Sequence, residues 1–156
     1  MAFSDTIQTD FSEQISDVIS TINGANRFLV ISHVRPDGDA IGSVSGLVKS
    51  LRKAGKNVQV ALADPAPERF AFVLDEDHIG KPGEIEIDHE VIFVLDAGDL
   101  ARTGFDSDLE DTGAVLVNID HHASNTIFGD VNFVDTAASS TCEMIVRLIH
   151  QAGLPL

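Results

Sequence analysis

Three short apolar segments of this chain each end in a group of Asp and His residues, and this pattern restricts the fold more than any other feature. The segments are residues 28–31, 91–95 and 114–117. Each is uninterrupted and of strand length, which is typical of strands buried on both faces of a parallel sheet. Parallel sheets bind their ligands beyond the carboxyl ends of the strands. We therefore expect the three polar groups to converge at one edge of the sheet.

Helical periodicity separates these strands. Apolar residues recur at intervals of three and four over residues 11–22, after Asp39 and over residues 139–149. A further strand is predicted at 58–62 and a short helix at 68–74. Asp39 is also a candidate N-cap for the helix that follows it. The alternation predicts an α/β fold in which helices cover a mostly parallel sheet on both faces.

Composition limits the functions that such a domain can have. The 156 residues are 44% hydrophobic, enough for the core of one domain. Ten Lys and Arg against 25 Asp and Glu give a net charge of −15, which argues against a basic groove for long duplex nucleic acid. No apolar run approaches the roughly 20 residues that cross a bilayer, and residues 1–10 do not resemble a signal peptide. We expect a cytoplasmic protein that does not bind membranes.

Small residues in two of the predicted helices point to packing. Cys142 is the only cysteine, so an intramolecular disulfide is excluded and a reducing compartment is favoured. We interpret Cys142 as a small core residue, not a nucleophile. Gly42 and Gly46 lie four residues apart, which favours close contact between helices. The chain has no Gly-x4-Gly-Lys-Ser/Thr motif, which excludes a P-loop nucleotide triphosphatase.

Seven titratable side chains would meet at the predicted edge: His33, Asp37, Asp39, Asp96, Asp120, His121 and His122. Taken singly, an Asp after a strand is often a turn former or helix cap, and an adjacent His pair is often on the surface. Packed together without partners, the carboxylates would repel one another. Two divalent cations, roughly 3.5–4 Å apart and sharing one carboxylate, would remove that repulsion. Asp96 is the best bridge because it stands alone between the other two groups. Oxygen and nitrogen ligands without sulfur favour Mn²⁺, with Fe²⁺, Co²⁺ or Zn²⁺ as alternatives.

Three segments of the chain resemble the first three motifs of the DHH phosphoesterase superfamily, which is named for its Asp-His-His triplet. They are His-Val-Arg-Pro-Asp-Gly-Asp-Ala-Ile-Gly-Ser at 33–43, Val-Leu-Asp-Ala-Gly-Asp at 94–99 and Ile-Asp-His-His at 119–122. The first motif and Val-Asp-Thr-Ala-Ala-Ser-Ser at 134–140 are most similar to the bifunctional oligoribonuclease and PAP phosphatase group. Family II pyrophosphatases usually carry Asn-Pro-Asp-Thr-Asp in the first motif, and RecJ-type exonucleases lack its leading His.

The resemblance implies a ligand set for two Mn²⁺ ions. His33 and Asp37 would bind one ion, Asp39 and His121 would bind the other, and Asp96 would bind both.

The remaining motif residues would act on the substrate or support the site. Asp120 would take part in catalysis with Asp96 by orienting the site. His122 would contact the substrate phosphate, and Arg35 is a second candidate for that contact. Ser139 and Ser140 are expected to cap the last helix.

The resemblance also implies that residues 1–156 form the N-terminal catalytic domain of a longer protein. Family members carry a fourth motif with a further metal-binding Asp, and a smaller C-terminal domain that binds the substrate. Neither occurs in these residues, so we expect a fragment whose activity alone is weak or absent. Closure of the second domain normally orders the substrate.

The implied activity is Mn²⁺-dependent hydrolysis, by water that two metals activate, of short oligoribonucleotides from the 3′ end and of 3′-phosphoadenosine 5′-phosphate (PAP). The partner would be a small nucleotide or short RNA, and a homodimer is one possible assembly. Three alternatives stay open: hydrolysis of cyclic or linear dinucleotides, hydrolysis of pyrophosphate, and a non-catalytic module that binds metal or nucleotide.

Overall fold

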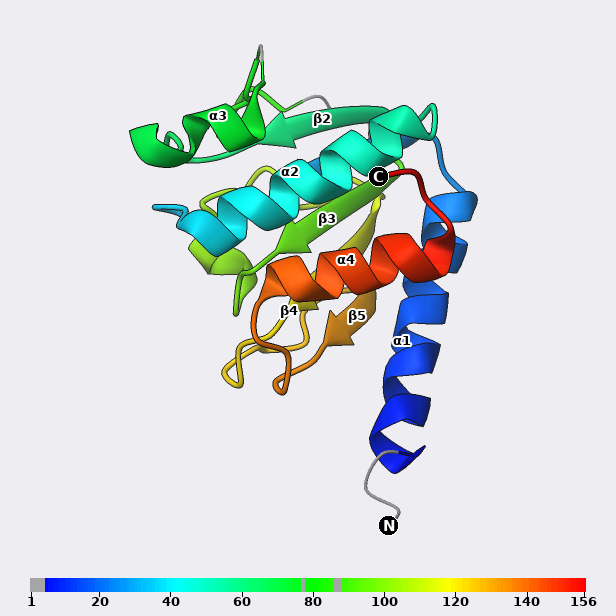
Figure 1. The fold of residues 1–156 in the computed structure, drawn as a ribbon. Coiled ribbons are helices and arrows are strands. Elements are labelled where there is room, and N and C mark those ends of the chain that lie inside the picture. The colour runs from blue at the N-terminus through cyan, green and yellow to red at the C-terminus, as the bar shows by residue number, and fades with distance from the viewer. Residues whose placement is uncertain (1–4, 77, 86–87) are drawn as a thin grey trace.

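A five-stranded parallel sheet forms the centre of the domain (Figure 1). The computed structural model describes residues 5–76, 78–85 and 88–156. The strands are β1 (Arg27–Ile31), β2 (Asn57–Ala61), β3 (Val91–Leu95), β4 (Val115–Asp120) and β5 (Val131–Val134). Their order is β2-β1-β3-β4-β5, and every neighbouring pair is parallel. The expected α/β fold with a parallel sheet is confirmed.

Three of the four α-helices in the described residues cover one face of this sheet. The helices are α1 (Asp5–Asn23), α2 (Gly38–Lys53), α3 (Ala71–Leu74) and α4 (Thr141–Ala152), with 3-10 helices η1 (Glu68–Phe70) and η2 (Leu100–Thr103). Side chains of α1, α2 and α4 pack in one core against Phe28 and Phe93. The opposite face, which includes Leu29 and Val94, packs against Leu100 of η2 and against Phe105. The second face therefore has a thinner cover of one 3-10 helix and irregular chain.

Several element boundaries differ from the sequence-based expectation. β5 was not predicted, because Val-Asn-Phe-Val is short and carries a polar residue in the middle. β4 continues through Asp120, so the Asp of the triplet is part of the strand. The suggested capping role of Asp39 is wrong: Asp37 is the N-cap of α2 and accepts a hydrogen bond from the Ala40 N–H at 2.9 Å. In the described part of the chain, no helix is long and apolar enough to cross a membrane.

The strand order reverses direction between β1 and β3. From β1 the chain crosses through α2 to β2 on one side, and it later returns to β3 on the other side of β1. The segments that leave the carboxyl ends of β1 and β3 therefore diverge, and this divergence opens a crevice in parallel sheets. His33 follows β1 and Asp96 follows β3, so the first two motifs lie at this reversal point.

Two glycines of α2 face α4, and the close contact between these helices depends on the first of them. A Cβ atom at Gly42 would lie 2.7 Å from the Cys142 Sγ, whereas one at Gly46 would lie 3.6 Å from the Ile145 Cγ2. Only the first distance is too short for a Cβ contact. The packing interpretation of both glycines is confirmed, and Cys142 fills the space above Gly42. The contact brings the amino end of α4 next to the amino end of α2.

We expect Gly42→Ala to destabilise the protein by about 1–3 kcal/mol, because the new methyl group must displace the Cys142 thiol. Gly46→Ala is the matched control on the same helix face. It meets an ordinary contact and exchanges glycine for a better helix former, so its effect should be neutral or stabilising by up to about 1 kcal/mol. Urea unfolding measures both. Equal effects of the two substitutions would contradict the packing argument, and Cys142→Ala should relieve the cost of Gly42→Ala.

Candidate metal centre

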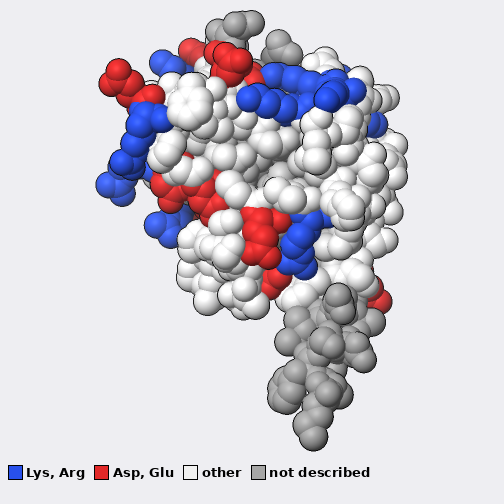
Figure 2. All heavy atoms as spheres, in the orientation of Figure 1, with Lys and Arg blue, Asp and Glu red and all other residues white. Residues whose placement is uncertain are grey.

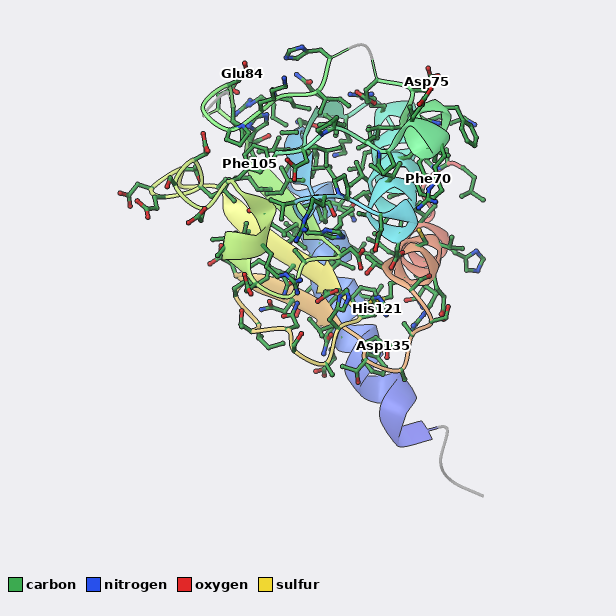
Figure 3. All side chains as sticks on the ribbon, turned by 90° about the vertical axis from the view of Figure 1, so that its left-hand side faces the viewer. Phe70, Asp75, Glu84, Phe105, His121 and Asp135 are labelled. Carbon is green, nitrogen blue, oxygen red and sulfur yellow. The ribbon has the colours of Figure 1, made fainter. Side chains whose placement is uncertain are left out.

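The seven predicted side chains come together at the carboxyl edge of the sheet. His33 follows β1, Asp37 and Asp39 begin α2, and Asp96 follows β3 directly. The Asp-His-His triplet ends β4 and starts the next loop. Figure 3 looks onto this end of the sheet and shows His121 near the amino ends of α2 and α4. The three motifs therefore lie together in the structure, as predicted.

The two oxygens of Asp96 lie between two imidazole rings. Asp96 Oδ2 is 3.5 Å from the His33 Nε2, which is also 3.7 Å from the Asp37 Oδ1. Asp96 Oδ1 is 3.6 Å from the His121 Nε2, which is also 3.4 Å from the Asp39 Oδ2. The site thus divides into two His–Asp groups that share one carboxylate. Such sharing is the arrangement that a pair of neighbouring cations requires.

Ring orientation at His33 suits a metal ligand. Its Nδ1 lies 2.7 Å from the carbonyl oxygen of Val34, so Nδ1 carries the proton and donates it to that oxygen. When the ring is neutral, the lone pair of Nε2 therefore faces Asp37 and Asp96, as a metal ligand requires. Histidine ligands commonly have their second ring nitrogen fixed in this way by a backbone carbonyl.

The backbone of Asp96 adopts a left-handed conformation with φ of +62°. This region is costly for residues other than glycine, by an amount of the order of 1 kcal/mol, and it is concentrated at functional sites. The Asp96 N–H donates to the carbonyl oxygen of Ile119 at 3.0 Å, so β4 holds the turn. Asp96 is only 2% exposed. The end of β3 is therefore built to present one buried carboxylate.

The amino end of α4 holds two of the carboxylates, a role that the sequence analysis missed. Asp39 accepts hydrogen bonds from the backbone N–H groups of Thr141 at 3.0 Å and Cys142 at 2.8 Å. The buried hydroxyl of Thr141 donates to the Asp96 Oδ1 at 2.9 Å. Ser140 is the N-cap of α4, as predicted for the serine pair. In the sequence, Thr141 is the third hydroxyl residue of the Ser-Ser-Thr run, and this extra hydroxyl was the feature that could have indicated its contact with Asp96.

Charge repulsion and hydrogen bonding shift the pKa values of this cluster in different directions. Burial raises the pKa of Asp96, with a further increase from the nearby charge of Asp39 and a decrease from the contact with His33. Burial also acts to raise the pKa of Asp39, but the backbone N–H groups of Cys142 and Thr141 hold it below its usual value. Contact with Asp96 raises the pKa of His33 to about 9, against desolvation. Negative charge in excess is the dominant property of the site.

Cys142 does not contribute a thiolate to this cluster. Burial raises the pKa of its thiol to about 12, and the neighbouring Asp39 adds to the shift. Its Sγ lies 3.4 Å from the backbone carbonyl oxygen of Asp39. A thiol that stays protonated is neither a nucleophile nor a metal ligand at neutral pH.

The side chain of Asp120 contacts the His122 ring. Its Oδ1 accepts the backbone N–H of His121 at 2.9 Å and lies 2.6 Å from the His122 Nδ1. Asp120 is fully buried, whereas the His122 side chain is 44% exposed. The His122 Nδ1 is also 3.8 Å from the Asp96 Oδ1, so geometry alone would admit His122 as a ligand. The much shorter contact with Asp120 occupies that nitrogen and leaves Nε2 for another partner.

Arg35 lies beside the cluster in a shallow hollow of about 410 Å³. Pro36, Asp64, Pro65 and Pro67 complete its lining. Arg35 has a left-handed φ of +49°, and its N–H donates to the Asp64 Oδ2 at 2.7 Å. Within the described residues, its guanidinium group forms no hydrogen bond or ion pair. The hollow thus offers apolar ring surfaces and one available cation two residues from Asp37.

One group of basic residues lies away from this edge, at and just beyond the carboxyl end of α2. Four of the ten Lys and Arg residues occur in residues 49–56, and Figure 2 shows basic side chains gathered over the carboxyl end of α2. This placement complements the dipole of the helix. These four basic residues are therefore not placed to attract an anionic ligand to the acidic cluster.

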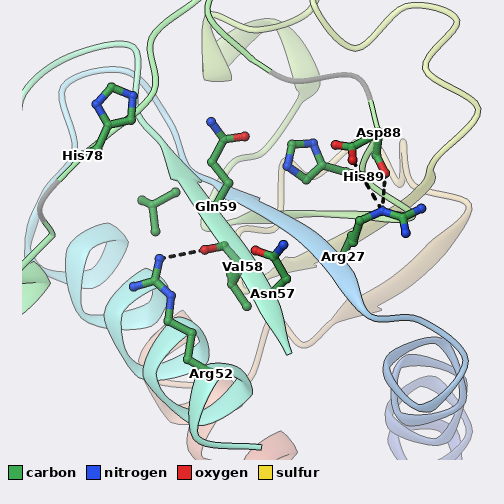
Figure 4. A pocket seen from close by; sticks show the side chains of 9 residues that line it. Arg27, Arg52, Asn57, Val58, Gln59, His78, Asp88 and His89 are labelled. Atoms are coloured by element: carbon green, nitrogen blue, oxygen red, sulfur yellow. Dashed lines mark hydrogen bonds and ion pairs between the residues drawn. The ribbon is translucent and has the colours of Figure 1, made fainter. Parts of the chain in front are cut away.

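A second cavity, of about 260 Å³, lies along the outer edge of β2 (Figure 4). Its two arginines already have partners. The Arg52 guanidinium donates to Glu76 at 2.6 Å and to the carbonyl oxygen of Val58 at 2.7 Å, and the Arg27 Nε donates to the carbonyl oxygen of Asp88 at 2.8 Å. This cavity includes none of the seven clustered residues.

A parallel α/β sheet whose reversal point carries two His–Asp groups with one shared carboxylate defines a class of domain, one with a candidate metal centre at the carboxyl edge of its sheet. Comparison with known families is more specific. Residues 27–155 match the DHH family, N-terminal domain. Because this match spans most of the chain, the protein belongs to the DHH family.

Two curated relatives are named bifunctional oligoribonuclease and PAP phosphatase NrnA. The Thermus thermophilus relative is 31% identical over 146 residues, or 90% of this chain, and the Bacillus subtilis relative is 36% identical over 141 residues, or 85% of this chain. This chain spans 41% of the length of each. A solved structure titled as an exopolyphosphatase-related protein from Bacteroides fragilis superposes with a TM-score of 0.79 at 27% identity, covering 91% of this chain and 44% of that one.

We expect the metal-free protein to lose stability as pH rises from about 6.5 to 9. The pKa of His33 is about 9 in the folded state against 6.5 for the ordinary group, so its protonated form stabilises the fold fully below pH 6.5. That contribution disappears as pH passes through 9. Urea midpoints measured in chelator at pH 6, 7.5 and 9 test this, with His33→Gln as the control. Parallel pH curves for the two proteins would contradict the assignment.

Proposed function

We propose that this chain is the metal-binding domain of a phosphoesterase that hydrolyses short oligoribonucleotides and PAP with two Mn²⁺ ions. One observation carries the proposal: the two oxygens of Asp96 separately face His33 and His121. The names of the DHH relatives support the reaction class and the substrates.

The donor set fits two divalent cations. In the proposed assignment, His33 and Asp37 hold one ion, Asp39 and His121 hold the other, and Asp96 is shared. Imidazole and carboxylate donors without thiolate suit Mn²⁺, and they also accept Fe²⁺, Co²⁺ and Zn²⁺. The fixed ring of His33 and the excess negative charge around Asp96 both support this assignment.

Bound cations of this kind supply positive charge to phosphoryl oxygens and acidify water for attack on phosphorus. The residues of the chain hold the proposed ligand side chains in place. Backbone N–H groups of α4 hold Asp39, and the Thr141 hydroxyl holds Asp96, so the ligand carboxylates are oriented before any ion binds. Asp120 orients His122, whose exposed ring is placed to contact a substrate phosphate.

Charge and size favour a small substrate. A net charge of −15 repels a long polyanion, whereas one or two phosphates can be neutralised locally. Arg35 is the proposed second phosphate contact, and the adjacent proline-lined hollow of about 410 Å³ is large enough for a nucleoside. These features support nucleotides over inorganic pyrophosphate as substrates.

Single substitutions should separate the two cation positions. We expect the wild-type chain to bind two Mn²⁺ ions, His33→Asn and His121→Asn to bind one each, and Asp96→Asn to lose both at concentrations that saturate the wild type. Isothermal titration calorimetry gives the stoichiometry. His150→Asn is the matched control, because His150 is exposed at the far end of α4, and it should bind two ions. A wild-type stoichiometry of one would contradict the shared-carboxylate site.

Hydrolysis is tested by Mn²⁺-dependent release of phosphate from PAP and of mononucleotide from a two-nucleotide RNA. Pyrophosphate and a cyclic dinucleotide are measured in parallel, with Asp96→Asn as the inactive control. We expect turnover of PAP and the short RNA by the full-length protein that carries this domain, and weak or no turnover by residues 1–156 alone. In the full-length protein, Asp96→Asn should lower turnover at least about 1,000-fold, because a shared ligand affects both ions. Turnover of pyrophosphate alone, or activity retained in Asp96→Asn, would overturn the proposal.

A further inference from the structure

We propose that Asn125 is a positioning residue of the site. Its side-chain amide fixes the carboxylate of Asp120, which in turn holds His122 with its proton on Nδ1 and its Nε2 free for the substrate. The inference rests on the proposed function only in taking His122 as a substrate contact. The hydrogen bonds of Asn125 stand independently of it.

Both side-chain oxygens of Asp120 have hydrogen-bond donors. The two histidines of the triplet contact Oδ1, and Asn125 donates to Oδ2. The Asn125 Nδ2 donates to the Asp120 Oδ2 at 2.8 Å. The other oxygen, Oδ1, accepts the His121 N–H and lies 2.6 Å from the His122 Nδ1. Asp120 is fully buried, so a lost donor on either oxygen would not be replaced freely by water.

The orientation of the Asn125 amide is determined by its other contacts. Its Oδ1 accepts the backbone N–H of Ile127 at 2.8 Å and the Nδ2 of Asn118 at 2.8 Å. An N–H group requires an acceptor, so the oxygen must face Ile127 and the NH₂ group must face Asp120. Asn118 is fully buried and also donates to the Asn132 Oδ1 at 2.9 Å. The network therefore holds Asn125 in a single orientation.

The same side chain joins the His122 loop to the turn at Asp96. The Asn125 Nδ2 lies 3.2 Å from the carbonyl oxygen of Ala97, the residue after Asp96. One residue further on, the Thr126 N–H donates to the carbonyl oxygen of Gly98 at 2.9 Å. Asn125 thus sets the position of His122 relative to the proposed shared ligand.

Without this donor, the buried Oδ2 of Asp120 would lack its side-chain partner, and the carboxylate would no longer be held from both sides against His122. The His122 ring is 44% exposed, and its described contacts are the Asp120 and Asp96 oxygens and the neighbouring His121 ring. A free neutral imidazole prefers its proton on Nε2, which would then face the substrate as a donor. The Asp120 contact selects the opposite tautomer.

The network offers a matched pair of variants. Asn125→Asp exchanges the NH₂ group that faces Asp120 for an oxygen. Asn132→Asp makes the same exchange in the same network, but the affected group donates to the carbonyl oxygen of Gly129 and not to Asp120. Asn125→Ala removes the donor without adding charge, in case two facing carboxylates share a proton.

The first readout needs no turnover. Nitrogen NMR of protein labelled in histidine, with His122 assigned by substitution, reports the tautomer of its neutral ring in metal-free protein. We expect Nδ1 to be protonated in the wild type and in Asn132→Asp, and the Nε2–H form to become populated in both Asn125 variants. An Nε2–H ring in the wild type, or no difference between the Asn125 and Asn132 variants, would overturn the inference.

The second readout is kinetic. We expect Asn125→Asp to lower kcat for PAP about 10-fold or more, in the range typical of residues that support a metal site, while its Mn²⁺ affinity stays within about threefold of Asn132→Asp. Equal kcat values in the two variants would overturn the inference. If the full-length protein that carries this domain hydrolyses none of the phosphoesters, the proposed function fails, and the NMR comparison still decides the positioning role.

Discussion

Repulsion between carboxylates is the constraint on which the rest of this structure depends. Asp37, Asp39, Asp96 and Asp120 meet at one edge of the sheet, and each is stabilised by a different neighbour. Asp37 caps α2, Asp39 accepts the first N–H groups of α4, Asp96 lies between two imidazoles, and Asp120 has an amide partner. Distributing the donors in this way keeps four acidic groups oriented in a chain that already carries a net charge of −15. The four carboxylates are therefore held in fixed orientations without a bound ion.

The fold supplies those donors through helix packing. A glycine at position 42 allows α4 to approach α2, and that approach places the Thr141 and Cys142 N–H groups on Asp39. The left-handed turn at Asp96 depends on the same packing, because the amino end of α4 places the Thr141 hydroxyl within hydrogen-bond distance of the Asp96 carboxylate. Core packing and site geometry are therefore not separable on this side of the sheet.

Sequence patterns predicted the parts of the structure that depend on periodicity. The strand at residues 91–95 has the predicted bounds, and the convergence of the three motifs followed from the parallel arrangement. The missing parts depend on contacts between distant residues. Thr141 reaches Asp96 across 45 positions, and although the Ser-Ser-Thr run shows a hydroxyl group beyond the helix cap, it does not identify the distant carboxylate that accepts from it. β5 was missed because Asn132 interrupts its apolar pattern, and this asparagine is needed for the polar network behind Asp120.

The chemistry of that network has a consequence for how the protein responds to its surroundings. Asn118, Asn125 and Asn132 are neutral amides that neither gain nor lose a proton over the physiological range. On the opposite side of the cluster, the His33 imidazole binds and releases protons, with a pKa near 9 in the metal-free protein. A rise in pH through 9 therefore changes the charge of His33, while the three amides keep theirs. The hydrogen bonds that hold Asp120 behind His122 do not depend on the protonation state of the rest of the cluster.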